Sequence, residues 1–162
     1  MKTHAQPIHL PHRHAHDACV HDAVSRAEGL CADRGIRLTA QRRRVLELVW
    51  SGHQPIGAYE ILERMRDDGT RAAQPTVYRA LDFLLEHGLV HRLESLNAFI
   101  GCPSPTGDHA SVFLICRDCR EVTESADSEA DATLDRLALG HGFKAERRVV
   151  EITGLCAQCA AN

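Results

Sequence analysis

Two pairs of cysteines in the second half of the chain have the spacing of metal ligands. Cys116 and Cys119 form one pair and Cys156 and Cys159 the other, with two residues inside each pair. Four thiolates presented by two such turns build a closed tetrahedral zinc site that leaves no position for water or substrate. We therefore expect a structural zinc ion whose binding energy contributes to folding.

A second set of donors is scattered between the two halves of the sequence. It comprises one thiol, two imidazoles and one carboxylate, from Cys102, His91, His109 and Glu124. Together they make a chemically reasonable tetrahedral zinc set, which would join the two halves of the chain. Spacing alone is weak evidence here, because each His is also consistent with an ordinary surface or hinge side chain.

Composition narrows the class of protein. The chain has 162 residues, seven Cys, eleven His and a formal net charge of -3, so it is no bulk polycation, and nucleic-acid contact would require a local basic patch. No run approaches the ~20 apolar residues of a membrane span, and the N-terminus lacks the apolar run of a signal peptide. We expect a cytoplasmic protein with no membrane partner, in which reduced thiols bind metal rather than form disulfides.

The first half has the pattern of four helices followed by a small hairpin. Six of the eleven His fall in residues 1–22, which we expect to form a flexible His-rich tail. Apolar residues then recur at the three- and four-residue steps of helices. The expected helices and strands cover about residues 23–34, 40–51, 57–67, 74–87, 89–93 and 98–100. This order predicts a winged helix-turn-helix domain over residues 23–101.

The second half, residues 102–162, alternates strands with one helix. An apolar strand is expected at 112–115, a short strand through Val122, a helix at 128–141 and a strand at 143–152. The whole chain is therefore expected to be α+β, with a small α/β zinc-binding domain after the winged helix.

The fourth helix has the features of a DNA-reading helix. Tyr78 and Arg79 project away from its apolar stripe and lie in the first turns, where a recognition helix reaches base edges. Thr76 lies in the same turns. An Arg recognises guanine with two hydrogen bonds, and a Tyr ring packs on a thymine methyl. Phosphate contacts are expected from Arg37, Arg42, Arg43, Arg44 and Arg71. The alternative is a basic helix face that is merely solvated.

Three motifs together point to one family. They are RLTAQR at residues 37–42, PTVYRAL at residues 75–81 and the paired Cys-x-x-Cys turns. From Val24 to Cys159 the chain resembles the ferric uptake regulator family of bacterial metal-responsive repressors, and its zinc uptake branch in particular. The resemblance implies a winged-helix domain, an α/β dimerisation domain and a homodimer that binds an AT-rich palindrome when loaded with metal.

The resemblance also implies roles for individual residues and two zinc ions per chain. The structural zinc is assigned to Cys116, Cys119, Cys156 and Cys159, and the regulatory zinc to His91, Cys102, His109 and Glu124. Tyr78 and Arg79 match the base-contacting pair. Iron-sensing members carry a His-rich run where this chain has residues 110–113, which leaves at most Asp131 and His141 for a third metal and argues against an iron or peroxide sensor.

The expected function is therefore a zinc-dependent repressor of zinc-uptake genes, and not an enzyme. One alternative is an iron-, manganese- or peroxide-responsive member of the same family. Another is a zinc hydrolase, with Glu124 as general base beside a metal that keeps one position open. A third is a zinc-stabilised interaction module that does not bind DNA. Cys31 is expected in the core, and Cys19 has no assigned role.

Overall fold

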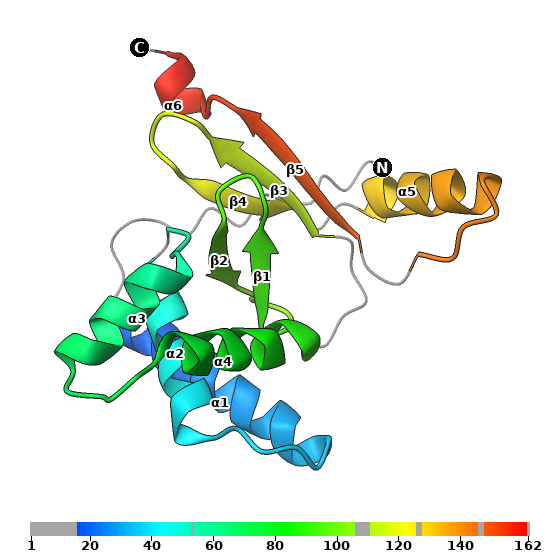
Figure 1. Cartoon of the computed structure of the whole chain (residues 1–162). Helices are drawn as coiled ribbons and strands as arrows, with labels where there is room; N and C mark the ends of the chain where they lie inside the picture. The colour runs from blue at the N-terminus through cyan, green and yellow to red at the C-terminus, as the bar shows by residue number, and fades with distance from the viewer. Residues whose placement is uncertain (1–15, 53, 106–110, 126–127, 146–147, 162) are drawn as a thin grey trace. The chain divides into compact units, whose positions relative to one another are not determined.

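A computed structural model describes residues 16–52, 54–105, 111–125, 128–145 and 148–161, and these form two compact units (Figure 1). The winged-helix unit contains the described residues up to 105, and the C-terminal unit contains those from 111 onward. The division falls after residue 107, so Cys102 stays with the winged helix, whereas the sequence placed it at the start of the second domain. No described helix is both long and apolar enough to cross a membrane.

The winged-helix unit has four helices and a two-stranded wing. Its elements are α1 (His16–Asp33), α2 (Ala40–Trp50), α3 (Ala58–Asp67), α4 (Gln74–Glu86), β1 (Val90–Leu93) and β2 (Ala98–Gly101). The fully buried side chains that fill its core come from every helix and from the wing, as with Leu46, Ile61 and Leu84. Cys31 lies in this core at 2 % exposure, as predicted, and burial raises the pKa of its thiol.

The first helix begins earlier than predicted. Residues 16–22 were assigned to a flexible tail, but α1 starts at His16. Val20 packs against the core of the unit, and Val24 one turn later is buried in it, so the apolar stripe extends further back than the sequence suggested. The polar, His-rich composition around Val20 hid this stripe. The rest of the tail, residues 1–15, lies outside the described residues.

Local signals place the ends of the other helices. Thr39 is the N-cap of α2, and its hydroxyl accepts a hydrogen bond from the backbone N–H of Arg42 at 3.4 Å. Gly88 has φ +70° after α4, where the N–H of Leu89 donates to the carbonyl of Leu84 at 2.8 Å. This Schellman turn stops the helix and leads the chain directly into β1.

The C-terminal unit is a three-stranded sheet with one crossover helix. Its elements are β3 (Ser111–Cys116), β4 (Val122–Ser125), α5 (Ser128–Gly140), β5 (Val149–Gly154) and α6 (Ala157–Ala160). The strand order is β4-β3-β5, with β3 antiparallel to β4 and parallel to β5. The parallel pairing requires a crossover connection, which α5 provides. The last strand runs from 149 to 154, whereas the sequence placed it at 143–152, and α6 was not predicted.

Candidate functional site

The four predicted zinc-binding cysteines lie together in the C-terminal unit. Their sulfur atoms are all within 4.8 Å of one another, and the Sγ atoms of Cys119 and Cys156 are 3.7 Å apart. The parallel register of β3 and β5 pairs Cys116 with Gly154, so each Cys-x-x-Cys turn starts at the same end of the sheet. The sheet therefore brings together two turns that are 36 residues apart in sequence.

The environment of the Cys116 sulfur favours binding of a cation by this cluster. Backbone amides of Cys119 and Cys156 point at the sulfur of Cys116 and lower the pKa of that thiol to about 6; the amide of Cys156 lies 3.4 Å away. Hydrogen bonding with the Cys156 and Cys119 sulfurs raises the pKa of Cys159 to about 12. The lowered pKa of Cys116 makes its sulfur a thiolate at neutral pH, the form that binds a cation. The all-sulfur donor set fits zinc.

The first cysteine turn is tight. Arg120 follows Cys119 with φ 62°, a left-handed conformation, and its N–H donates to the carbonyl of Cys116 at 3.0 Å. On the other side, the N–H of Arg117 donates to the carbonyl of Gly154 at 2.9 Å. The turn is therefore held both by its own closure and by the neighbouring strand.

Two of the four predicted regulatory-zinc ligands share one face of the wing. His91 pairs with Ile100 across β1 and β2, so Cys102, two residues further along, is its diagonal neighbour on the same face. Cys102 is 3 % exposed, and its backbone N–H donates to the carbonyl of Leu89, which continues the pairing beyond β2. The Nε2 atom of His91 is buried. A soft thiol and an imidazole on one face suit a zinc ion.

The other two predicted ligands do not belong to the described part of the winged-helix unit. Glu124 lies half-buried on β4 of the C-terminal unit, and His109 is outside the described residues. Asp131 is half-buried on α5 and His141 is exposed just after it. Among the described residues, the four cysteines form the one group of three or more ligands close enough to share a metal, so no third ligand accompanies Asp131 and His141.

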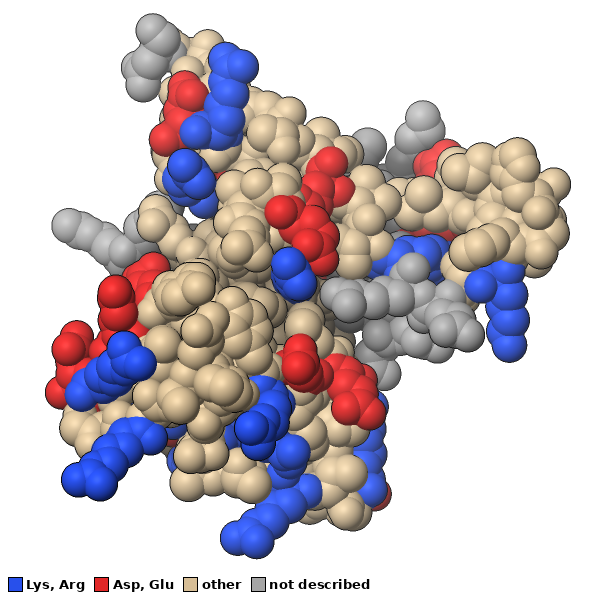
Figure 2. Space-filling model, in the orientation of Figure 1, with Lys and Arg blue, Asp and Glu red and all other residues tan. Residues whose placement is uncertain are grey.

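The predicted DNA-reading residues lie on the exposed side of α4. Tyr78 and Arg79 are both exposed, while Val77, Ala80 and Leu81 are buried. A groove separates the first turns of α2 and α4, and it is lined by Thr39, Gln41, Arg42, Thr76, Arg79 and Ala80. Figure 2 shows basic side chains protruding along the lower margin of the winged-helix unit. The groove thus joins three of the predicted DNA-binding side chains, two of them arginines.

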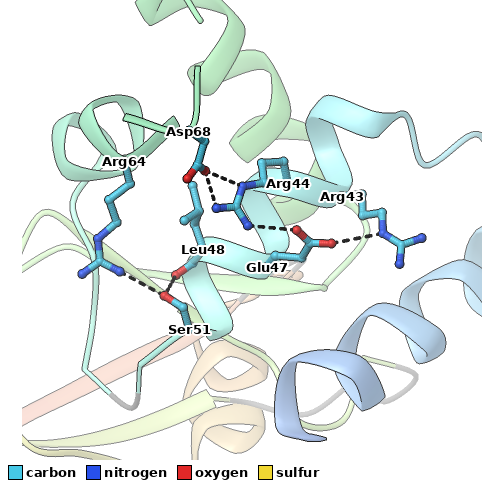
Figure 3. A network of polar contacts seen from close by, with 7 residues as sticks. All are labelled: Arg43, Arg44, Glu47, Leu48, Ser51, Arg64 and Asp68. Atoms are coloured by element: carbon cyan, nitrogen blue, oxygen red, sulfur yellow. Dashed lines mark hydrogen bonds and ion pairs between the residues drawn. The ribbon is translucent and has the colours of Figure 1, made fainter. Parts of the chain in front are cut away.

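Arg44, which the sequence assigns to the phosphate contacts, is paired with carboxylates of its own unit. Its guanidinium is paired with Asp68, with Nε at 2.9 Å from the carboxylate, and with Glu47 at 3.1 Å (Figure 3). Burial opposes the charge, but these hydrogen bonds outweigh it and raise the pKa of Arg44. Arg43 likewise contacts Glu28 and Glu47. This network fastens α2 to α1 and to the end of α3.

Sequence reasoning missed four side chains on or beside α4. Gln41 lines the groove, and Phe83 carries the guanidinium of Arg42 on its ring. Gln74 donates to the hydroxyl of Tyr59 at 3.2 Å, which links the first turns of α3 and α4. Tyr59 is 66 % exposed, and its place outside the core stripe of α3 was the one signal in the sequence.

Comparison with known proteins identifies the chain's relatives. The sequence model of the ferric uptake regulator family matches residues 33–153. The chain belongs to the ferric uptake regulator family. Within this family it is similar to the zinc uptake regulation protein of Escherichia coli (strain K12), with 41 % identity over 141 residues, which cover 85 % of this chain and 81 % of the relative.

Solved structures of ferric uptake regulator family members have the same fold. A zinc uptake regulator complexed with zinc and DNA superimposes with a TM-score of 0.82 at 39 % identity, covering 88 % of this chain and 95 % of that one. The crystal structure of holo XcZur gives a TM-score of 0.80 at 41 % identity, covering 91 % of this chain and all of the other. Winged helix and C-terminal α/β unit are thus the common architecture.

Proposed function

We propose that this chain is a zinc-dependent transcriptional repressor that acts in the cytoplasm and represses zinc-uptake genes. The observation that carries the proposal is that one unit presents both an exposed recognition helix and two zinc-type ligands, His91 and Cys102, on its wing. The similarity to the zinc uptake regulation protein of Escherichia coli and to the zinc uptake regulator complexed with zinc and DNA supports the same function. All seven cysteines are free thiols, so they are available as metal ligands.

The proposed DNA contacts divide into reading and positioning groups. Tyr78 and Arg79 read base edges from the first turns of α4, and Thr76 and Arg37 hold the phosphates beside them. Arg42 borders the same groove. For Arg44 we propose a stabilising role, since its guanidinium is already engaged by Asp68 and Glu47.

Two zinc ions per chain are proposed. The four-cysteine cluster holds a structural zinc, which is closed to substrate because every coordination position is taken by protein. His91, Cys102, His109 and Glu124 hold the regulatory zinc, a donor set of nitrogen, sulfur and oxygen drawn from both units. Because Cys102 supplies a thiolate, this set favours zinc over the oxygen-rich sites of iron and manganese.

A homodimer is proposed from the apolar surface of the C-terminal unit. Leu114 and Ile152 are directly paired across β3 and β5 and are 43 % and 52 % exposed. Leu137, Leu139 and Phe143, on and after α5, are exposed by 60 % or more. Large exposed apolar patches mark protein–protein contact sites. A second copy would also supply the second recognition helix, so that the dimer reads two half-sites ~34 Å apart on an AT-rich palindrome.

The regulation follows from the ligands' positions in the chain. The regulatory metal supplies a coordination centre shared by both units. His91 and Cys102 belong to the winged-helix unit and Glu124 to the C-terminal unit. A metal bound by all of them would therefore restrict the orientations that the winged-helix units of the dimer sample. A ligand shifts such an equilibrium only by its differential affinity for the two states, typically ~1–3 kcal/mol.

Operator binding measured over a range of buffered free zinc tests this function. We expect binding to rise with zinc, and Cys102→Ser to abolish the zinc response while the dimer persists in sedimentation. Cys19→Ser is the matched control and should behave as the wild type, since Cys19 lies half-buried on α1, outside both ligand sets. Zinc-independent binding would overturn the switch, and salt-insensitive binding would overturn the phosphate contacts.

A further inference from the structure

Arg42 is fixed at three points between the two helices that flank the groove. Its backbone N–H donates to the Thr39 N-cap, and its Nη1 donates to the carbonyl of Arg37 at 2.7 Å. Its Cζ lies 3.6 Å from the centroid of the Phe83 ring on α4. One residue thus connects the segment before α2, the first turn of α2 and the recognition helix.

Phe83 connects Arg42 to the part of α4 that carries Arg79. Phe83 follows Arg79 by four residues, so the two side chains emerge on the same side of α4. Arg42 and Arg79 accordingly line the same groove. Because the phenyl ring is 8 % exposed, it is held by the core and provides a fixed platform for the guanidinium.

Arg42 also differs from its neighbours in charge compensation. Arg43 and Arg44 are paired with carboxylates, whereas none of the ion pairs found within the described parts of the chain involves Arg42. Its guanidinium donates to a neutral carbonyl and lies on a ring face, so its positive charge remains available to a phosphate at the groove. The planar guanidinium of Arg stacks flat on a ring, whereas the compact ammonium of Lys is more strongly hydrated and makes such contacts less often.

We propose that Arg42 is a positioning residue for DNA recognition, which sets the spacing of α2 and α4 through Phe83 and thereby orients Arg79. The proposal rests on the DNA-binding function above and deepens it. A positioning residue differs from a simple phosphate contact, which depends on charge alone. A simple phosphate contact tolerates Lys, whereas replacing a stacked guanidinium by Lys weakens the contact with the ring.

A double-mutant cycle with the zinc-loaded full chain tests the role. Operator affinity is measured for the wild type, Arg42→Lys, Phe83→Leu and the double variant, each at several salt concentrations. We expect each single change to weaken binding about 3- to 10-fold, as for loss of a partly desolvated cation–π contact. The double variant should be no weaker than either single one, because both changes remove the same contact. The salt slope of Arg42→Lys should equal that of the wild type, since the charge is kept.

Arg26→Lys provides the matched control. Arg26 lies over the Trp50 ring at 5.8 Å from its centroid, a cation–π contact in the same unit but away from the groove. This variant should lose as much thermal stability as Arg42→Lys and keep wild-type affinity. Wild-type affinity of Arg42→Lys, or additive effects of the two single changes, would overturn the positioning role. Absence of operator binding by the zinc-loaded wild type would overturn the proposed function itself.

Discussion

The indole ring of Trp50 lies directly against the backbone of Gly101. A β-carbon at residue 101 would overlap the ring, with Cζ2 2.6 Å away. Trp50 is the last residue of α2 and Gly101 the last of β2, so this contact joins the end of a helix to the end of the wing. Cys102, the proposed zinc ligand, is the next residue along the chain.

Adding a methyl group at this contact should destabilise the winged-helix unit. We expect Gly101→Ala to lower the free energy of unfolding by ~1–3 kcal/mol, the range for overpacking a well-filled site, as measured by thermal denaturation. Gly29→Ala is the control, because nothing lies within 4 Å of a β-carbon there and the residue is inside α1. That change should stabilise the chain by ~0.5–1 kcal/mol. Equal stability of the two variants would contradict the packing described for Trp50.

Removal of the structural zinc should unfold the C-terminal unit. Cys119→Ser takes one sulfur from the cluster, and we expect loss of one zinc per chain by elemental analysis together with loss of dimer in sedimentation. A folded, dimeric Cys119→Ser protein would show that the cluster is not structural. Chelation should release the metal more readily at lower pH, since protons compete for the thiolates.

Separate substitutions of Arg79 and Arg44 should distinguish an effect on operator affinity from an effect on thermal stability. Arg79→Ala should weaken operator binding by tenfold or more, because a bidentate base contact is worth ~1–3 kcal/mol. Arg44→Ala should leave operator affinity near that of the wild type but lower stability by roughly 1 kcal/mol, as expected for partly exposed ion pairs. Titrations of operator DNA and thermal melts distinguish the two effects. A large loss of affinity in Arg44→Ala would return this residue to the DNA-contacting set.

Replacement of Arg120 should relieve a strained turn. Its φ of 62° is unfavourable for a side chain with a β-carbon and unrestricted for Gly. We expect the Arg120→Gly protein to bind as much zinc as the wild type. Relief of the strain should raise its free energy of unfolding by ~1 kcal/mol and therefore its melting temperature. Arg120→Val, with a β-branched side chain, should lower it. The proposal that the turn is strained fails if Val is tolerated as well as Gly.

The parts of the fold that were predicted correctly depend on local chemistry. Helix α4 was placed to within a residue because Pro75 suits its first turn and Gly88 its end. The four cysteines were grouped because their spacing encodes the turns that present them. The start of α1 was missed because Val20 contributes to a core that forms only once the other helices have packed.

Other features depend on contacts between distant residues. The pairing of Arg44 with Asp68 spans 24 residues, and no local pattern distinguishes it from an arginine that faces DNA. The last strand begins at Val149, rather than near Phe143, because its pairing starts where Ser111 of β3 begins. Phe143 is 66 % exposed, outside any strand. Its apolar character belongs to the surface that we propose is covered by a second copy.

The pairing of β3 with β5 has a consequence for how the C-terminal unit forms. These strands are parallel, so their pairing closes a long loop through α5 before any contact repays the lost chain entropy. A metal shared by the cysteines at the end of both strands would act as a removable cross-link. A disulfide that closes a loop of this length stabilises a fold by ~3–4 kcal/mol, because it restricts the unfolded chain. Unlike a disulfide, this cross-link is supplied by the very ion whose scarcity the protein is proposed to report.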